Sequence, residues 1–268
     1  MSAACAQIVA RDDPRLHATA MFAPEPARSA LMVLYAFDCE LSRATSASKE
    51  SLIPRMRLQW WREMINAASN GAPPRAHEVA APLAEMLMAD SSEKGPTHLT
   101  ALVDAHEKIL DLPWSEMDYA AWRTSRFHAL MSAAALWLTQ DGTSPPEMSW
   151  LADAAALRNA HRMAKAGGQV MVSGISGPDL ASFARGEMTD LFATKCREIA
   201  EHGLADLERA RAAISDDRLL PVLLPTMWAE RELRSVNRNP AVVLTGLEPR
   251  QRPFDGMRLL VRAMRRHW

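Results

Sequence analysis

The sequence predicts an all-α protein that forms one helical domain over residues 1–268. Turn-forming residues gather in a few short clusters, such as Asn70–Pro74 and Asp141–Pro146, and the segments between the clusters are long. Those segments are rich in Ala, Leu, Met, Arg and Glu, which favour helices, and they lack the β-branched alternation typical of strands. No repeat, low-complexity tract or change of composition marks a domain boundary.

Composition excludes several classes of protein. Lys and Arg total 31 against 32 Asp and Glu, so no global positive charge favours nucleic acid. The cysteines Cys5, Cys39 and Cys196 form no C-x-x-C pair, which argues against a disulfide framework and a thiolate zinc site. The longest uncharged apolar stretch, Ala129–Leu138, is shorter than the ~20 residues of a spanning helix, and no secretory signal is visible. We therefore expect a cytoplasmic protein.

The segment around Trp60 predicts an amphipathic helix. Apolar side chains at Met56, Trp60, Met64 and Ala67 step by four and three residues, which is helical spacing. We expect this stripe to be buried, with Ile53 and Trp61 flanking it.

A longer helix is predicted from Met117 to Thr139. At 1.5 Å per residue it extends over roughly 35 Å, enough to cross a domain. Its expected core side is formed by Ala120, Phe127, Met131, Ala134 and Leu138. A second long helix is predicted from Asp179 to Ile214, with Gly186 and Gly203 as points where it bends or breaks.

The C-terminal segment, residues 253–268, predicts a basic amphipathic helix. Its apolar side comprises Met257, Leu260, Val261, Met264 and Trp268, and its basic side comprises Arg258, Arg262, Arg265 and Arg266. Such a helix either lies on an anionic membrane surface or an acidic partner, or docks on the bundle with its arginines near the negative end of the helix dipole. Both alternatives stay open at the level of sequence.

Common catalytic and metal-binding motifs are absent from the sequence. It contains no glycine-rich phosphate loop, no G-x-S-x-G and no H-E-x-x-H. The eight histidines are scattered, and no two are four residues apart on a shared helix face. We therefore predict no metal site.

The most informative motif lies between Arg28 and Ser46. Arg28 precedes Tyr35-Ala36-Phe37 by seven residues, and a Leu-Gln-Trp-Trp-Arg element follows at 58–62. This combination resembles the squalene/phytoene synthase family over residues 11–69 and, less closely, to Trp228. The resemblance implies a single bundle of antiparallel helices around a central cavity, and the head-to-head condensation of two prenyl diphosphates.

Catalysis in that family implies two aspartate-rich motifs that hold Mg²⁺. Ionising an allylic diphosphate requires metal ions, and Mg²⁺ prefers oxygen ligands. Aligned from Tyr35, the first motif falls on Ser42, Arg43 and Ser46, and its usual arginine falls on Cys39. None of these side chains is a carboxylate, and the positive charge of Arg43 repels Mg²⁺.

The second motif is expected within residues 157–169, which contain no acidic residue. The segment instead carries Arg158, Arg162 and Lys165 at i, i+4 and i+7, so the three share one helix face. Together with Arg28 and Arg43, they suggest an anion site, for instance for a lipid phosphate. The alternative is a solvated basic face.

Other acidic residues do not replace the missing motifs. Asp38 and Glu40 are two residues apart, so they point about 200° apart around their helix and cannot face one metal ion. Glu107 and Asp111 have i, i+4 spacing but lie in a different helix, where we expect a solvated acidic turn.

These departures favour a branch of the family that lacks the aspartates and acts in assembly of respiratory complex I. The resemblance then implies a non-catalytic protein, peripheral on the inner face of a membrane, whose partners are a membrane protein complex or its assembly partners. One alternative is an active prenyltransferase, the only case in which a Mg²⁺ cofactor is expected. Another is a carrier of an isoprenoid or phospholipid.

The resemblance and the basic face together define the candidate residues. No catalytic residue is expected. The ligand-pocket candidates are Arg28, Tyr35, Phe37, Cys39, Arg43, Arg158, Arg162 and Lys165. The residues expected to hold the first two helices together are Trp60, Trp61 and Arg62.

Overall fold

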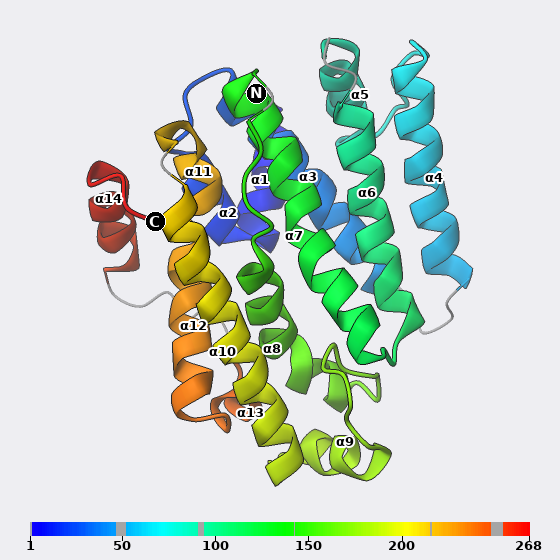
Figure 1. The fold of residues 1–268 in the computed structure, drawn as a ribbon. Coiled ribbons are helices and arrows are strands. Elements are labelled where there is room, and N and C mark those ends of the chain that lie inside the picture. The colour runs from blue at the N-terminus through cyan, green and yellow to red at the C-terminus, as the bar shows by residue number, and fades with distance from the viewer. Residues whose placement is uncertain (1, 47–51, 91–93, 142, 215, 248–253) are drawn as a thin grey trace. The chain divides into compact units, whose positions relative to one another are not determined.

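The computed structural model describes residues 2–46, 52–90, 94–141, 143–214, 216–247 and 254–268. These residues form helices and connecting segments, with no strand among them (Figure 1). The predicted all-α class is therefore confirmed. Within the described ranges, no helix combines the length and the apolar character needed to cross a bilayer.

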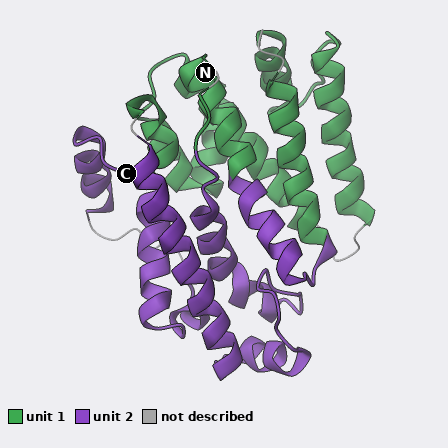
Figure 2. Ribbon diagram, viewed as in Figure 1, with its two compact units in different colours: residues 1–110, 128–145, 216–225 green, residues 111–127, 146–215, 226–268 purple. Residues whose placement is uncertain are grey.

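The chain divides into two compact units, coloured separately in Figure 2. Unit 1 comprises residues 1–110, 128–145 and 216–225, and unit 2 comprises residues 111–127, 146–215 and 226–268. Helix α7, Glu116–Thr139, contributes its first half to unit 2 and its second half to unit 1. The single domain expected over residues 1–268 stays a prediction.

Unit 1 is organised around helix α3. Within this unit, α3 packs against α1, α2, α4, α5 and α6, and its buried positions run almost without interruption from residue 31 to residue 39. The helices that lie wholly within unit 1 are α1 (Ala3–Asp12), α2 (Pro14–Ala20), α3 (Ala27–Ser46), α4 (Leu52–Ser69), α5 (Ala80–Met88), α6 (Gly95–Glu107) and α11 (Leu220–Leu223). Short 3-10 turns lie at Lys108–Asp111, which spans the division between the units, and at Asp217–Leu219.

Unit 2 is built on a triangle of mutually packed helices, α8, α10 and α12. Its helices are α8 (Ser149–Lys165), α9 (Gly177–Ala184), α10 (Asp190–Ala213), α12 (Thr226–Arg238), α13 (Val242–Thr245) and α14 (Asp255–Met264). Trp150 at the start of α8 is buried and donates from Nε1 to the hydroxyl of Thr226, the first residue of α12, at 3.0 Å.

Side-chain caps explain where several helices begin. Ser2 accepts a hydrogen bond from the backbone of α1, and Asp13 caps α2 directly before Pro14, whose fixed φ suits a first helical position. Ser176 and Thr189 cap α9 and α10 in the same manner. Each cap satisfies a backbone N–H that has no partner inside its helix.

The second long helix, predicted over Asp179–Ile214, is interrupted at one of its two glycines. Gly186 has φ of +91°, a left-handed conformation, and it separates α9 from α10. Gly203 lies inside the uninterrupted α10, so the expectation of a break there is wrong. A Cβ at this position would lie 2.9 Å from both Asp153 Oδ2 and Leu233 Cδ1. Gly203 therefore allows α10 to approach α8 and α12 closely.

The buried face of α4 differs from the predicted stripe. Met56 is 64% exposed, and Trp60 and Ala67 are half-buried. The buried side chains are Pro54, Leu58, Trp61, Met64, Ile65 and Ala68. Apolar residues on this helix form two adjacent stripes with helical spacing, the predicted one and the one just listed. Packing against α3, α5 and α6 buries the listed stripe.

Helix α7 begins one residue before its predicted start and ends where predicted, at Thr139. Its core side is partly as expected, because Met131 and Ala134 are buried while Phe127 and Leu138 are half-buried. Ala120 is exposed, which contradicts its assignment to the core. In this first half of the helix the larger rings of Tyr119 and Trp122 are buried instead.

Candidate functional site

Most of the candidate residues on α3 are buried in the interior of unit 1. Tyr35 and Phe37 are completely buried, and Cys39 is nearly so. The Tyr35 hydroxyl has no hydrogen-bond partner among the described residues. Burial, reinforced by the charges of Asp13 and Asp38, raises the pKa of Tyr35. Burial likewise raises the pKa of Cys39, which keeps its thiol protonated and unreactive.

The two acidic side chains of α3 point toward different neighbours. Asp38 Oδ1 lies 2.8 Å from Nε2 of the buried His106 on α6. Glu40 Oε1 accepts a hydrogen bond from Arg43 Nη1 at 2.5 Å, and burial raises the pKa of its carboxyl group. The two carboxylates therefore have different partners, Asp38 a residue of α6 and Glu40 a residue of its own helix.

The positions of the first aspartate motif carry no carboxylate. Ser42 and Ser46 are exposed, and the Ser46 hydroxyl donates to the backbone carbonyl of Ser42 at 2.8 Å. Arg43 binds Asp12 of α1 as well as Glu40. The guanidinium group is therefore paired with two carboxylates, one on α1 and one on α3.

A small cavity of about 270 Å³ lies beside Arg43 in unit 1. We call it the Arg43 cavity, and its lining residues are Glu40, Arg43, Ala44, Arg57, Trp60, Trp61 and His77. Its aromatic wall is continuous, since the Trp60 and Trp61 rings lie 4.9 Å apart and the His77 ring lies 5.6 Å from Trp60 and 5.4 Å from Trp61. Trp61 is buried and Trp60 is half-buried, so the predicted stripe and its flank have exchanged places at this point of α4.

Arg28 and Arg62 lie away from the Arg43 cavity lining. Arg28 Nε donates to the backbone carbonyl of Ala23 at 3.1 Å. Arg62 Nη2 binds Asp104 and Glu107 of α6, each at 2.5 Å. Glu107 also accepts from Arg55 at 3.0 Å, so the solvated acidic turn expected there is wrong for Glu107. Its carboxylate instead ties α4 to α6.

The basic residues of α8 differ in their partners and in their exposure. Arg158 binds Glu232 of α12 at 2.8 Å, whereas Arg162 is exposed and donates to Asn159 of its own helix at 2.7 Å. Lys165 is exposed. These residues belong to unit 2, whereas Arg28 and Arg43 belong to unit 1, so a combined anion site stays a prediction.

A buried charged network centred on Asp153 was not predicted from the sequence. Asp153 is completely buried on α8 and receives hydrogen bonds from Tyr119 Oη at 2.7 Å and from Arg123 Nε at 2.9 Å. Arg123 also reaches Asp206 of α10 at 2.7 Å, and Ser149 donates to the same carboxylate at 2.6 Å. Burial raises the pKa of Asp153, while Arg123 acts in the opposite direction. The sequence signal that could have identified the network is Asp153 itself, a single acidic residue within an alanine-rich stretch.

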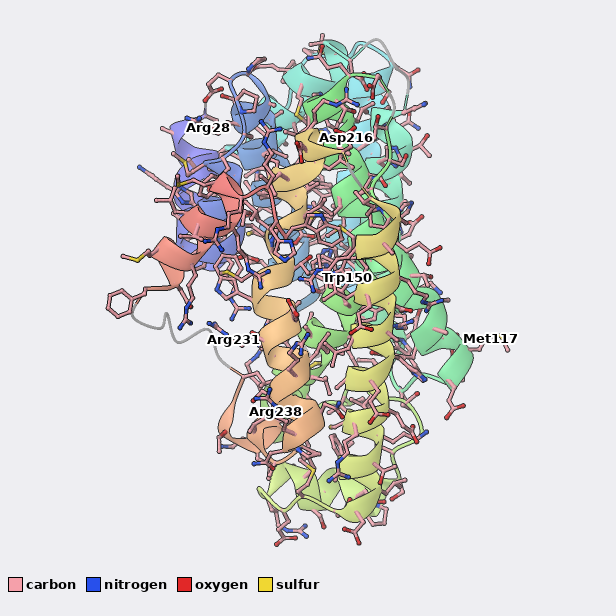
Figure 3. The ribbon with its side chains drawn as sticks, turned by 60° about the vertical axis from the view of Figure 1, so that its left-hand side comes forward. Arg28, Met117, Trp150, Asp216, Arg231 and Arg238 are labelled. Atoms are coloured by element: carbon pink, nitrogen blue, oxygen red, sulfur yellow. The ribbon has the colours of Figure 1, made fainter. Side chains whose placement is uncertain are left out.

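A larger cavity of about 730 Å³ lies between α12 and α14 in unit 2. We call it the arginine cleft, and its lining residues are Met227, Glu230, Arg231, Arg234, Ser235, Arg238, Asn239, Met257, Arg258, Val261 and Arg262. Arg231 and Arg238 are labelled on α12 in Figure 3. The spacing of Arg231, Arg234 and Arg238 places the three on one face of α12. This spacing is visible in the sequence and could have predicted a basic surface there.

The C-terminal helix is shorter than predicted, and Pro253 lies outside the described residues. Its apolar side is exposed: Met257, Leu260, Val261 and Met264 are between 40% and 75% accessible. Asp255 and Leu259 anchor α14 instead, through an ion pair from Asp255 to Arg231 at 2.8 Å and burial of Leu259. Trp268 does not share the apolar side, because it follows the end of α14 and stacks on Trp150.

Comparison with known proteins identifies the family of this chain. No curated protein matches the chain. The squalene/phytoene synthase family matches residues 9–172, which include the α3 motif, the Trp60–Trp61 element and all of α8. The all-helical structure agrees with the isoprenoid synthase fold of that family. The chain belongs to the squalene/phytoene synthase family.

Proposed function

We propose that this chain is a non-catalytic family member that acts as an interaction or assembly factor at a membrane surface. The observation that carries the proposal is the state of the first motif positions. Ser42 and Ser46 cannot ligate Mg²⁺ as carboxylates do, and Arg43 occupies the nearby acidic groups Asp12 and Glu40.

The chemistry of the donor set supports this proposal. A diphosphate held through Mg²⁺ requires several hard oxygen ligands gathered at one place. The described residues offer no group of three or more His, Cys, Asp or Glu that could hold a metal ion. Asp153, the buried acid on α8, is bound by Tyr119 and Arg123 and therefore does not fit a metal ligand either.

A thermal-shift experiment tests the loss of the metal site. The purified chain is heated with Mg²⁺ and farnesyl diphosphate together, with each alone, and with neither. We expect no stabilisation that depends on both, because a ligand raises the melting temperature only if the folded state binds it. A Mg²⁺-dependent upward shift with the diphosphate would contradict the proposal.

A pull-down from native membranes tests the assembly role. By its resemblance to the family branch that acts in complex I assembly, the chain should retain respiratory subunits. A preparation that retains extractable isoprenoid or phospholipid but no respiratory subunit would instead favour the carrier function. The exposed apolar side of α14 and the arginine cleft are the features that keep the carrier as a second candidate.

A further inference from the structure

The arginine cleft has an excess of positive charge. Five arginines and one glutamate are among the described residues that line it. Glu230 is already bound by Arg211 at 2.7 Å and by Arg234 at 2.9 Å. Asp255, at the start of α14, is bound by Arg231. The acidic groups in and beside the cleft are therefore taken by a subset of the arginines.

Three further guanidinium groups remain weakly compensated. Arg238 is exposed and forms no ion pair with the residues that the structure describes. Arg258 lies 3.7 Å from Asp255, beyond hydrogen-bond distance. Arg262 approaches Glu230 at 3.5 Å, and its buried Nη1 has no hydrogen-bond partner within the described part of the chain. A buried donor without an acceptor is unfavourable, so this group favours an added anion.

Apolar side chains border the same cleft. Met257 and Val261 line it and are 61% and 40% exposed. With Leu260 and Met264 they occupy an arc of roughly 100° around α14, beside the arc of Arg258 and Arg262. Phe254, directly before the helix, is also exposed. The cleft therefore has a basic wall and an exposed apolar rim on a single helix.

We propose that the arginine cleft and the apolar rim of α14 form a docking surface for a bilayer that contains anionic phospholipid. The planar guanidinium groups suit phosphate oxygens, and the lipid phosphate would lie against Arg238, Arg258 and Arg262. The apolar side chains of α14 enter the boundary between headgroups and acyl chains, as in interfacial helices. An acidic peptide would match the arginines but would leave the apolar rim uncovered.

This inference rests on the proposed function only for the location at a membrane. It lies outside residues 9–172, the part that matches the family, and it involves none of the motif positions. The test measures lipid binding without any prenyl diphosphate. Failure of vesicle binding would therefore leave the argument from Ser42, Arg43 and Ser46 unaffected.

Co-sedimentation of the full chain with phospholipid vesicles tests the proposal. We expect binding to vesicles of phosphatidylcholine with phosphatidylglycerol and little binding to phosphatidylcholine alone. Arg238→Gln and Arg258→Gln should each weaken partitioning about fivefold, which corresponds to about 1 kcal/mol per basic residue at an anionic surface. Arg185→Gln removes the same charge from an exposed position outside the cleft and should have no comparable effect.

A second pair of variants tests the apolar rim. Met264→Ser should weaken binding to anionic vesicles, because Met264 is 75% exposed on α14. The matched control is Met117→Ser, at a methionine of similar exposure, 80%, on α7. Since all these side chains are exposed, the melting temperatures should stay unchanged and exclude misfolding as the cause.

Several results would overturn the proposal. One is equal binding to neutral and anionic vesicles. Another is a loss of vesicle binding in the control variants as large as that in the cleft and rim variants. A third is complete release from the vesicles by inorganic phosphate, which would indicate a site for a free anion. Stronger retention on immobilised polyglutamate than on anionic vesicles would indicate an acidic protein partner and would also contradict the lipid surface.

Discussion

The Arg43 cavity and the arginine cleft both place arginines beside a hollow, but their charges are balanced differently. At the Arg43 cavity, Arg43 binds Asp12 and Glu40, so these two carboxylates are neutralised. In the arginine cleft, Arg238 forms no ion pair with the described residues, and Arg258 lies 3.7 Å from Asp255, beyond hydrogen-bond distance. The first arrangement leaves no free carboxylate for a cation, whereas the second leaves guanidinium groups for an anion.

The difference separates charges that hold the fold from charges that are available to a ligand. Arginines with carboxylate partners, such as Arg62, Arg123 and Arg158, connect one helix to another. Arg238 and Arg258 form no ion pair that links one described helix to another. If this division is correct, removing a compensated charge should lower stability, and removing an uncompensated one should change binding.

Asp153→Ala is expected to have the largest effect on stability. It leaves the buried Tyr119 and the half-buried Arg123 without their main acceptor, which typically lowers the free energy of unfolding by about 3–5 kcal/mol. Urea denaturation measures the change. Arg238→Gln in the arginine cleft should alter the same quantity by less than about 0.5 kcal/mol. Similar losses in the two variants would remove the division between compensated and uncompensated charges.

Trp61→Ala measures how much the family signature contributes to the fold of unit 1. The Trp61 ring is 4% exposed and packs edge-on against Phe37, so its loss should destabilise by about 3 kcal/mol. Trp60→Ala should have a smaller effect, since Trp60 is half-buried. Thermal unfolding of both variants checks the order. A larger effect at Trp60 would mean that the packing of α4 on α3 is wrongly assigned.

Two tyrosine-to-phenylalanine variants compare a bonded hydroxyl with an unbonded one. Tyr119→Phe removes a 2.7 Å hydrogen bond to Asp153 and should lower stability by about 1.5–3 kcal/mol. Tyr35→Phe removes a hydroxyl without a partner among the described residues, so stability should stay the same or rise slightly. A clear loss of stability in Tyr35→Phe would show that the hydroxyl is bonded. Unchanged stability with impaired function would indicate that Tyr35 lines a working pocket.

Glu230 predicts a specific acid sensitivity for unit 2. Burial alone would raise the pKa of its carboxyl group, but hydrogen bonds and charge from Arg211 and Arg234 lower the pKa from 4.5 to about 2. A carboxylate with a depressed pKa stabilises the fold above its unfolded-state pKa, and this contribution is lost as the pH falls from 4.5 to about 2. Stability curves for Glu230→Gln should therefore be flatter in this interval. Identical curves would contradict the assigned ion pairs.

Much of the fold could be predicted because its signals are local. Helix-forming composition identified the all-α class, and the uninterrupted run of helix formers located α7 to within one residue. The family followed from a short motif around Tyr35 and Trp60. Where two apolar stripes lay side by side on α4, local spacing did not decide between them, because the choice depends on the helices packed against it.

The ion pairs and the arginine cleft depend on residues far apart in the chain. Arg123, Asp153 and Asp206 are 30 and 53 positions apart along the sequence and meet only through packing of their helices. No search for acidic residues at i, i+4 finds such a network. The role of Gly203 likewise could not be predicted from its local sequence, because it depends on Asp153 and Leu233 lying opposite it in the folded chain.

The measurement that tests the central claim most directly is a product assay. The purified chain is incubated with farnesyl or geranylgeranyl diphosphate and Mg²⁺, and both diphosphate release and head-to-head hydrocarbon are quantified. Because Ser42, Arg43 and Ser46 replace the carboxylates that would hold the metal, we predict no release above the protein-free control. Release of diphosphate together with a squalene- or phytoene-type hydrocarbon would contradict the account.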